Sequence, residues 1–214
     1  MYEKEAINIQ EQLRKKICLK DVKKKIKKVA GIDCSYSGKF ITASIVICKY
    51  PDLSLIEEKV HSQEVQFPYI PGFLAFREGP AILNIIKKTK NKPDIIFLNG
   101  HGIAHPKGIG LATHIGILIK KSTIGCAKKI LFGNYKKPSE VFGSYTFIEN
   151  NYGEKIGYVL RTFNKGIIFI SPGNMISLKT TLSITLSCLK KNFSFPYPLY
   201  LAHTLSKQHC QSKL

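Results

Sequence analysis

The chain begins with helical periodicity and then changes to the alternation of apolar and polar residues that is typical of strands. Apolar positions in residues 5–28 recur at helical spacing, and this predicted helix ends in a lysine-rich run. Strands are predicted at residues 29–37, 41–50 and 53–65, separated by short polar turns. Because short connections join antiparallel neighbours, the three strands predict a meander.

The rest of the chain alternates between helices and strands. Residues 71–90 have helical spacing, in which Pro80 is expected to kink or restart the helix. Residues 94–98, which are apolar after Asp94, have the pattern expected for a strand buried on both faces. Further elements are expected as a helix at 111–119, strands at 145–149, 155–162 and 166–171, and a helix at 177–190 before a proline-containing tail. This order predicts a single α/β domain over residues 1–214, with a mixed sheet flanked by helices.

The charge balance is strongly basic. Lys and Arg number 33 against 14 Asp and Glu, a formal net charge of +19. Such a field attracts polyanions, which indicates a nucleic-acid partner. A genome rich in lysine codons would produce the same balance, so charge alone does not decide. The lysine run before residue 28 is either a solvated face or a phosphate contact.

The cysteines and the N-terminal residues indicate the cellular compartment in which the protein is expected. Six cysteines are spread through the chain without a CxxC pair, which is typical of reduced thiols rather than of disulfides or a zinc site. The first residues are too polar and acidic for a signal peptide, and no apolar stretch reaches the ~18 residues of a membrane span. We expect a soluble, cytoplasmic protein.

Two acidic residues stand at positions that the pattern predicts to be buried. Asp33 interrupts an apolar strand, where a charge is costly unless it is paired or binds a metal. Glu78 shares its helical face with Leu74 and Ile82, so its carboxylate points towards the core. A metal site would explain both residues. A hydrogen-bonded structural role for Asp33, and a salt bridge from Glu78 to Arg77 or to a nearby lysine, are the alternatives.

A glycine-rich loop begins directly after the buried strand. Its first residue, Asn99, lies at the carboxyl end of that strand, where open α/β sheets bind ligands. Gly100 and Gly102 permit close approach of the backbone to a planar ligand. His101 and His105 are four residues apart, but the glycines and the following proline argue against a helical zinc motif.

Two further residues have side chains suited to phosphate chemistry. Lys128 lies among small apolar residues, and a fixed cation there would suit a phosphate or a metal-bound water. An ordinary surface lysine is the alternative. His203 is a lone histidine near the C-terminus, for which a structural role is the alternative to a catalytic one.

Taken together and in this order, these segments resemble the endonuclease V family. The similar segments are VAGIDCSY (29–36), PYIPGFLAFREGP (68–80), NGHGIAHPKGIGLATHIG (99–116), TIGCAKK (123–129), SPGNMISL (171–178) and LAH (201–203). They extend through nearly the whole chain, and the second and third are long and distinctive. The resemblance implies a ribonuclease H-like fold.

The resemblance also implies a reaction. Members of the family are metal-dependent endonucleases of nucleic-acid repair that recognise deaminated bases, deoxyinosine above all, and hydrolyse the second phosphodiester bond 3′ to the lesion. The implied ligands of Mg²⁺, with Mn²⁺ as the second candidate, are Asp33, Glu78 and the residue at position 99. Lys128 and His203 would assist around the scissile phosphate.

Binding residues follow from the same resemblance. Pro68, Tyr69, Ile70 and Pro71 match a wedge that parts the strands, and a rigid turn of this kind can fill the space that a flipped base vacates. The implied base pocket comprises Gly72, Leu74, Gly100, Gly102, Gly110 and Leu111, and the implied nucleic-acid contacts are His105 and Lys107. The expected partner is deoxyinosine-containing DNA, with inosine-containing RNA as a second candidate. The protein is expected to act as a monomer.

The chain departs from the family pattern at one metal-binding position. The family has aspartate where this chain has Asn99, and an amide keeps a carbonyl oxygen but lacks the negative charge. Because Mg²⁺ depends on carboxylates, weaker metal binding and reduced turnover are expected. The alternative function is a weakened or inactive protein that recognises inosine without cutting. A general nucleic-acid binder would not require the distinctive segments.

Smaller departures occur elsewhere. Lys107 replaces the usual arginine, which keeps the charge but loses bidentate geometry. Asn174 stands where histidine is common, and residues 196–200 read PYPLY in place of the usual approach to the last histidine.

Overall fold

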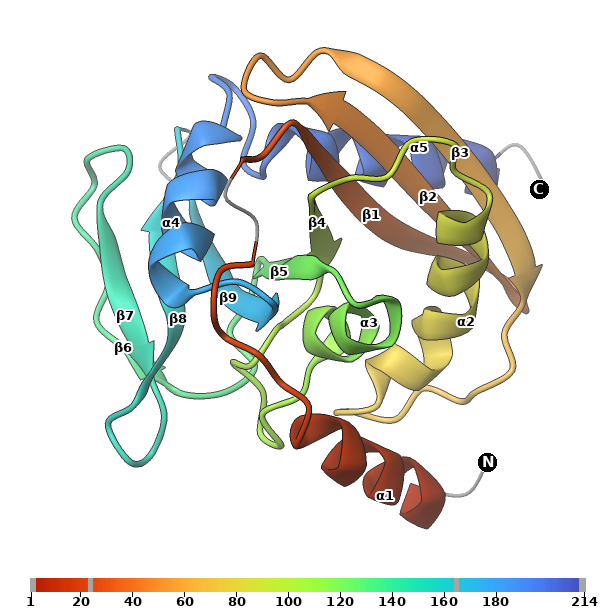
Figure 1. Cartoon of the computed structure of the whole chain (residues 1–214), viewed down its shortest axis with the longest axis horizontal. Coiled ribbons are helices and arrows are strands. Elements are labelled where there is room, and N and C mark those ends of the chain that lie inside the picture. The colour runs from red at the N-terminus through yellow and green to blue at the C-terminus, as the bar shows by residue number, and fades with distance from the viewer. Residues whose placement is uncertain (1–2, 23–24, 164–165, 212–214) are drawn as a thin grey trace.

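The computed structural model describes residues 3–22, 25–163 and 166–211, which form helices around one twisted nine-stranded sheet (Figure 1). The elements are α1 (Glu3–Arg14), β1 (Lys28–Ser37), β2 (Phe40–Lys49), β3 (Leu55–Glu64), α2 (Leu74–Lys87), β4 (Ile95–Asn99), α3 (Leu111–Ile119), β5 (Ser122–Ala127), β6 (Asn134–Tyr135), β7 (Tyr145–Glu149), β8 (Lys155–Arg161), β9 (Ile167–Asn174), α4 (Leu178–Ser187) and α5 (Tyr197–Gln211). The strand order is β3-β2-β1-β4-β5-β9-β8-β7-β6.

The sheet is mixed, as the sequence predicts. β1, β2 and β3 form the expected antiparallel meander, in which Asp33 pairs with Ser44 and Ser44 with Val60. β4 then lies parallel to β1, and β5 lies parallel to β4. β9, β8 and β7 extend the sheet with antiparallel pairs. The expected α/β class with a meander, parallel strands and flanking helices is confirmed.

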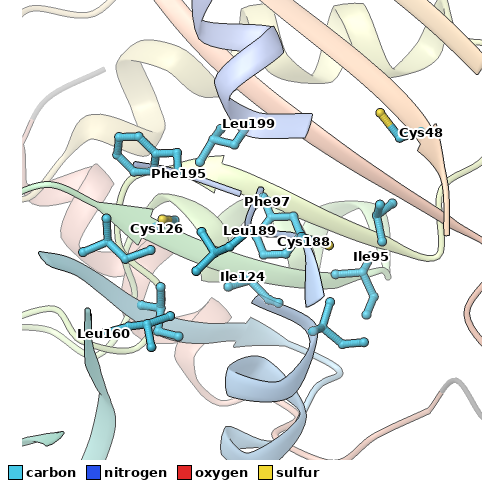
Figure 2. Packing of buried hydrophobic residues seen from close by; sticks show 14 of the residues in the cluster. Cys48, Ile95, Phe97, Ile124, Cys126, Leu160, Cys188, Leu189, Phe195 and Leu199 are labelled. Carbon is cyan, nitrogen blue, oxygen red and sulfur yellow. The ribbon is translucent and has the colours of Figure 1, made fainter. Parts of the chain in front are cut away.

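Helices cover both faces of the sheet and divide the core in two. Side chains of α2 and α3, such as Ile82 and Ile115, pack on one face with Ile32 and Ile45. Side chains of α4 and α5 pack on the other face with the central strands; Figure 2 shows Phe97 and Leu199 in this second cluster. β1 and β4 are therefore buried on both faces, which makes any charge on them depend on a partner.

The predicted first helix was too long. α1 ends at Arg14, and of the expected helix over residues 5–28 positions 23 and 24 lie outside the described residues. At Cys18 the backbone forms hydrogen bonds with β9 and the residue after it instead of helical ones. The Cys18 N–H donates to the Asn174 side chain at 3.0 Å, and the Met175 N–H donates to the Cys18 carbonyl. Asn174 therefore anchors the N-terminal segment to the end of β9.

The expected proline-containing tail is a helix. α5 runs from Tyr197 to Gln211 and packs against β1 and β2 (Figure 1). Prolines at 196 and 198 suggested a tail, but proline is tolerated in the first turn of a helix, where its missing N–H has no intrahelical partner. Pro80 lies inside α2, which continues through it, so the helix does not restart there.

The cysteines and the apolarity of the helices were the subject of two expectations from composition. All six cysteines are free thiols, and four of them are buried. No described helix is long and apolar enough to cross a membrane.

Asp21 is predicted to stabilise the start of α4. Its carboxylate accepts hydrogen bonds from the Ser177 N–H, the Ser177 hydroxyl and the Thr180 hydroxyl, each at 2.8 Å. Burial raises the pKa of Asp21, but these hydrogen bonds outweigh burial, so the pKa lies below its ordinary value. Asp21→Ala should lower the free energy of unfolding in urea by about 1 kcal/mol at neutral pH.

The pH dependence gives the control for this prediction. A carboxyl with a lowered folded-state pKa stabilises the fold above its ordinary pKa, and that contribution disappears as the pH falls through the folded-state value. The difference between wild type and Asp21→Ala should therefore shrink below pH ~4. Asp52→Asn, at an exposed carboxyl, should have little effect at any pH. A difference that does not change with pH would contradict the assignment.

Candidate active site

Asp33 is the centre of the candidate site. It lies on β1 with 4% of its surface exposed, in the interior of the molecule. One carboxylate oxygen accepts a hydrogen bond from the Asn99 amide nitrogen at 2.8 Å, and the other contacts His203 Nδ1 at 2.6 Å. Three separate elements, β1, β4 and α5, thus meet at one carboxylate. The charge of Asp33 is compensated by directed hydrogen bonds, as a buried carboxylate requires.

Close packing of α5 against β1 brings His203 to Asp33. A side chain at Gly31 would meet the backbone of Leu199 and Pro198 at 2.3 Å, so only glycine permits this approach. His203 lies one helical turn after Leu199 and therefore on the same face of α5. The Ser44 hydroxyl adds a hydrogen bond of 2.6 Å to the backbone of the same helix.

Glu78 lies on α2, buried at 8% exposure, and accepts a hydrogen bond from the Tyr36 hydroxyl at 3.0 Å. Burial, with the nearby charge of Asp33, raises the pKa of Glu78 to about 8. The alternative salt bridge with Arg77 does not form, although both residues are described. Arg77 instead donates to the Phe67 carbonyl at 2.7 Å and lies over the Tyr36 ring. Two carboxyl groups therefore share a poorly solvated region.

The side chains of the candidate site carry the types of oxygen atom that bind divalent cations. Asp33 and Glu78 are carboxylates, and Asn99 has an amide oxygen; oxygen ligands of this type are those that Mg²⁺ prefers. A cation would also relieve the cost of burying Glu78 beside Asp33. The arrangement lacks a third carboxylate, and no group of three or more His, Cys, Asp or Glu suited to a metal occurs among the described residues.

Lys128 has an exposed side chain, just after β5. Its ammonium group lies over the Phe195 ring, 5.5 Å from the centroid, rather than inside the protein. This is the placement of a surface lysine. Since β5 lies next to β4, Lys128 follows the same carboxyl edge of the sheet from which Asn99 projects.

A pocket opens next to the carboxylates. It contains five of the six expected residues, Gly72, Leu74, Gly100, Gly110 and Leu111, and also Ala75, His101, His105, Ile109 and Leu131. Gly100 directly follows Asn99, and Leu74 lies one turn before Glu78 on α2. Two segments of the pocket therefore also carry Asn99 and Glu78, and Asp33 joins them from β1 through its contact with Asn99.

Gly102 does not line the pocket, although it was expected there. A side chain at Gly102 would meet the Pro172 carbonyl oxygen at 2.1 Å, and its N–H donates to the Ser171 hydroxyl at 2.8 Å. Its role is to let the pocket loop pack directly on β9.

The two histidines of the loop are uncharged members of the pocket. Burial lowers the pKa of His101 to about 4, and burial together with the proximity of His101 lowers the pKa of His105 to about 4. His105 is 4% exposed and lies in the pocket wall. Lys107 is partly exposed and lies over the Phe73 ring, 4.6 Å from its centroid.

The expected wedge lies at the surface before α2. Tyr69 is 72% exposed between Pro68 and Pro71, which are both exposed. Ile70 is partly buried and packs against Phe67 and Phe73. A large aromatic ring is thus presented to solvent by a rigid turn.

Sequence reasoning missed several members of the site, among them Tyr36 and Leu131. Tyr36 is the hydrogen-bond donor to Glu78, and it lies on β1 three residues after Asp33. Its position close to Asp33 in the sequence could have indicated that Tyr36 belongs to the site. Leu131 closes one side of the pocket from the loop after β5, and an irregular loop has no periodicity that would have indicated it.

The class of protein is shown by comparison with known sequences. A family model described as Endonuclease V matches residues 11–204. The chain is 44% identical over 211 residues to Endonuclease V of Dictyoglomus turgidum, covering 98% of this chain and 92% of that protein. It is 45% identical over 203 residues to Endonuclease V of Thermosipho melanesiensis, covering 94% and 88%. The chain belongs to the endonuclease V family.

Solved structures have the same fold. Endonuclease V of Bacillus subtilis superposes with a TM-score of 0.94 at 30% identity, covering 100% of this chain and 95% of that one. Endonuclease V of Ciona intestinalis, solved with a 24mer DNA containing an inosine followed by a ribo-adenosine, gives 0.84 at 25% identity, covering 98% of each chain.

The contact at Gly102 predicts a large difference between two glycine-to-alanine variants. Gly102→Ala should lower the free energy of unfolding by about 2 kcal/mol or more, because a methyl group cannot be placed against the Pro172 carbonyl without moving the loop. Gly79→Ala is the control. A side chain at Gly79, inside α2, would make only an ordinary contact at 3.6 Å, and alanine favours helix by up to about 1 kcal/mol. Equal effects of the two substitutions in urea unfolding would contradict the packing described.

Proposed function

We propose that this protein is a metal-dependent endonuclease that recognises deoxyinosine in DNA and hydrolyses the second phosphodiester bond 3′ to it, with activity reduced by Asn99. One observation supports this most strongly: the two segments that line most of the pocket also carry Glu78 and Asn99, and Asn99 in turn contacts Asp33. A base held by Gly100 and Leu74 would therefore lie close to the acidic residues. The Ciona relative was solved with inosine-containing DNA. Inosine-containing RNA is the second candidate substrate.

The pocket suits an uncharged planar base. Its walls are backbone at glycines, apolar side chains, and imidazoles that remain neutral at physiological pH because burial lowers the pKa of His101 and His105 to about 4. A flipped hypoxanthine would replace stacking in the duplex with contacts to these walls. Tyr69 and its flanking prolines would occupy the space that the base leaves.

The carboxylates would hold Mg²⁺, with Mn²⁺ as an alternative, through Asp33, Glu78 and the Asn99 amide oxygen. When bound, such an ion activates water and stabilises the leaving oxygen of a phosphodiester. His203 uses Nδ1 to contact Asp33, which leaves Nε2 as the nitrogen available to a phosphate. Lys128, on the same sheet edge, is exposed and free to bring a positive charge to the phosphate.

Asn99 supports the reduced activity. Its amide nitrogen donates to Asp33, so in this arrangement Asn99 binds the very carboxylate oxygen that a shared cation would need. To act as a ligand, the amide must turn its oxygen towards the ion and give up that hydrogen bond. A neutral amide also attracts a divalent cation less strongly than a carboxylate does.

The same hydrogen bond favours a second function, an inosine-recognising protein that binds without cutting. Asn99 and His203 both contact the Asp33 carboxylate, and the base pocket is lined by other residues. Recognition would then not depend on turnover.

Restoring the carboxylate should restore activity. On a labelled duplex with a single deoxyinosine in Mg²⁺, Asn99→Asp should nick at least about 10²-fold faster than wild type, since a metal site contributes several kcal/mol to such reactions. With Mn²⁺ in place of Mg²⁺, the difference in nicking rate between Asn99→Asp and wild type should be smaller. The nick should fall at the second phosphodiester 3′ to deoxyinosine, and a matched deoxyadenosine duplex should stay intact.

The outcomes separate the two functions. If wild type binds the deoxyinosine duplex in a gel shift more tightly than the matched duplex but does not cut it, the binding function holds. Equal rates for wild type and Asn99→Asp would contradict the role given to Asn99. Nicking by neither protein, without preference for inosine in binding, would contradict both functions.

A further inference from the structure

Gln10 on α1 is a buried polar residue that none of the preceding functions uses. It is 1% exposed, and its amide nitrogen donates to the Gly72 carbonyl at 3.0 Å. Its amide oxygen is buried and has no hydrogen-bond partner among the described residues. Only one orientation of the amide places a donor opposite the Gly72 carbonyl, since the reverse would oppose two acceptors.

Stability alone does not account for a glutamine at this position. A buried polar atom without a partner is costly, and an apolar side chain of similar size would avoid that cost. Ala6, one turn earlier on the same helix, packs in an apolar cluster with Phe67 and Phe73. Gln10 also lines a cavity with Arg14 and Lys107, neither of which is a hydrogen-bond partner of its amide oxygen. The hydrogen bond to Gly72 is the one contact that leucine would not reproduce.

Gly72 joins the wedge to the pocket. It directly follows Pro71, the last residue of the wedge, and it lines the pocket. It also lies close to His105: a side chain placed on Gly72 would be 3.8 Å from His105 Nε2. A donor that holds the Gly72 carbonyl therefore fixes where the wedge ends relative to the pocket.

The wedge is held at both ends by long side chains from different helices. Before the wedge, the Phe67 carbonyl accepts a hydrogen bond from Arg77 of α2 at 2.7 Å. After it, the Gly72 carbonyl accepts the hydrogen bond from Gln10 of α1. In Figure 1 the segment that leads into α2 runs close to α1, outside the sheet. Ile70, between the two held carbonyls, packs into the cluster formed with α1, while Tyr69 points to solvent.

We propose that Gln10 is a positioning residue that fixes the wedge, Pro68 to Pro71, against the base pocket through the Gly72 carbonyl, so that the wedge can open a duplex at the lesion. This inference rests on the proposed function. Gln10 contacts neither base nor phosphate; it acts through Gly72. Its contribution is needed where two strands must be parted and is not needed where the target base is already unpaired.

The test compares one substitution on two substrates. In an Asn99→Asp background with Mg²⁺, Gln10→Leu should lose about tenfold in kcat/KM on a deoxyinosine duplex, the size expected for one positioned hydrogen bond. On the same sequence as a single strand, the loss should be less than about twofold. The melting temperature should change little, because leucine removes an unsatisfied buried oxygen while leaving the partly buried Gly72 carbonyl without its donor.

Gln12→Leu is the matched control, because Gln12 is exposed on the same helix. It should leave both substrates unaffected. A Gln10→Met variant repeats the test with an unbranched side chain, and 2-aminopurine fluorescence opposite the lesion reports strand opening directly. Opening should fall with Gln10→Leu and Gln10→Met but not with Gln12→Leu.

Two results would overturn the inference: equal losses on duplex and single strand, or no loss on the duplex. Should both Gln10 variants melt well below the parent, Gln10 would be a residue of the fold, which also overturns it. Failure of the proposed function would look different. In that case the parent itself would not distinguish deoxyinosine from deoxyadenosine on either substrate.

Discussion

A single buried carboxylate, Asp33, organises the part of the molecule on which function depends. It lies on a strand covered on both faces, where an ionised group is tolerated only with directed partners. Those partners come from β4 and α5, so the strand order and the packing of the C-terminal helix are both required at this one point. Gly31 permits that packing by letting the start of α5 touch β1. The site is therefore a consequence of how the sheet and α5 fit together, not of any local motif.

The pocket and the wedge depend on backbone more than on side chains. Gly102 lets the pocket loop rest on β9, and hydrogen bonds to the Phe67 and Gly72 carbonyls hold the two ends of the wedge. A rigid backbone suits recognition of a flipped base. Base flipping already costs free energy of unstacking, and a protein that is ordered beforehand adds no entropy cost of its own. The chain belongs to the endonuclease V family, and the Ciona member of that family was solved with inosine-containing DNA.

Much of the fold was predictable from the sequence, for identifiable reasons. The meander follows from alternation with short turns, and β4 from an apolar run between polar residues. α5 was not predictable in the same way, because its prolines suggested a tail, and β5 escaped because its small buried residues have no periodicity. Asp33 and Glu78 stood out because burial of a charge is costly. The contact between Asp33 and His203 joins residues 170 positions apart, and only tertiary packing creates it. Gln10 resembled an ordinary residue of a polar helix, and only its burial distinguished it.

Asn99 is the decisive residue of the proposed metal site: its amide donates to Asp33, where a carboxylate would share a cation. Isothermal titration calorimetry with Mn²⁺, comparing wild type with Asn99→Asp, tests this without reference to any substrate. The account predicts that Asn99→Asp binds Mn²⁺ at least about tenfold more tightly, because it adds a negative charge and removes the hydrogen bond that occupies Asp33. Equal affinities, or tighter binding by wild type, would contradict it.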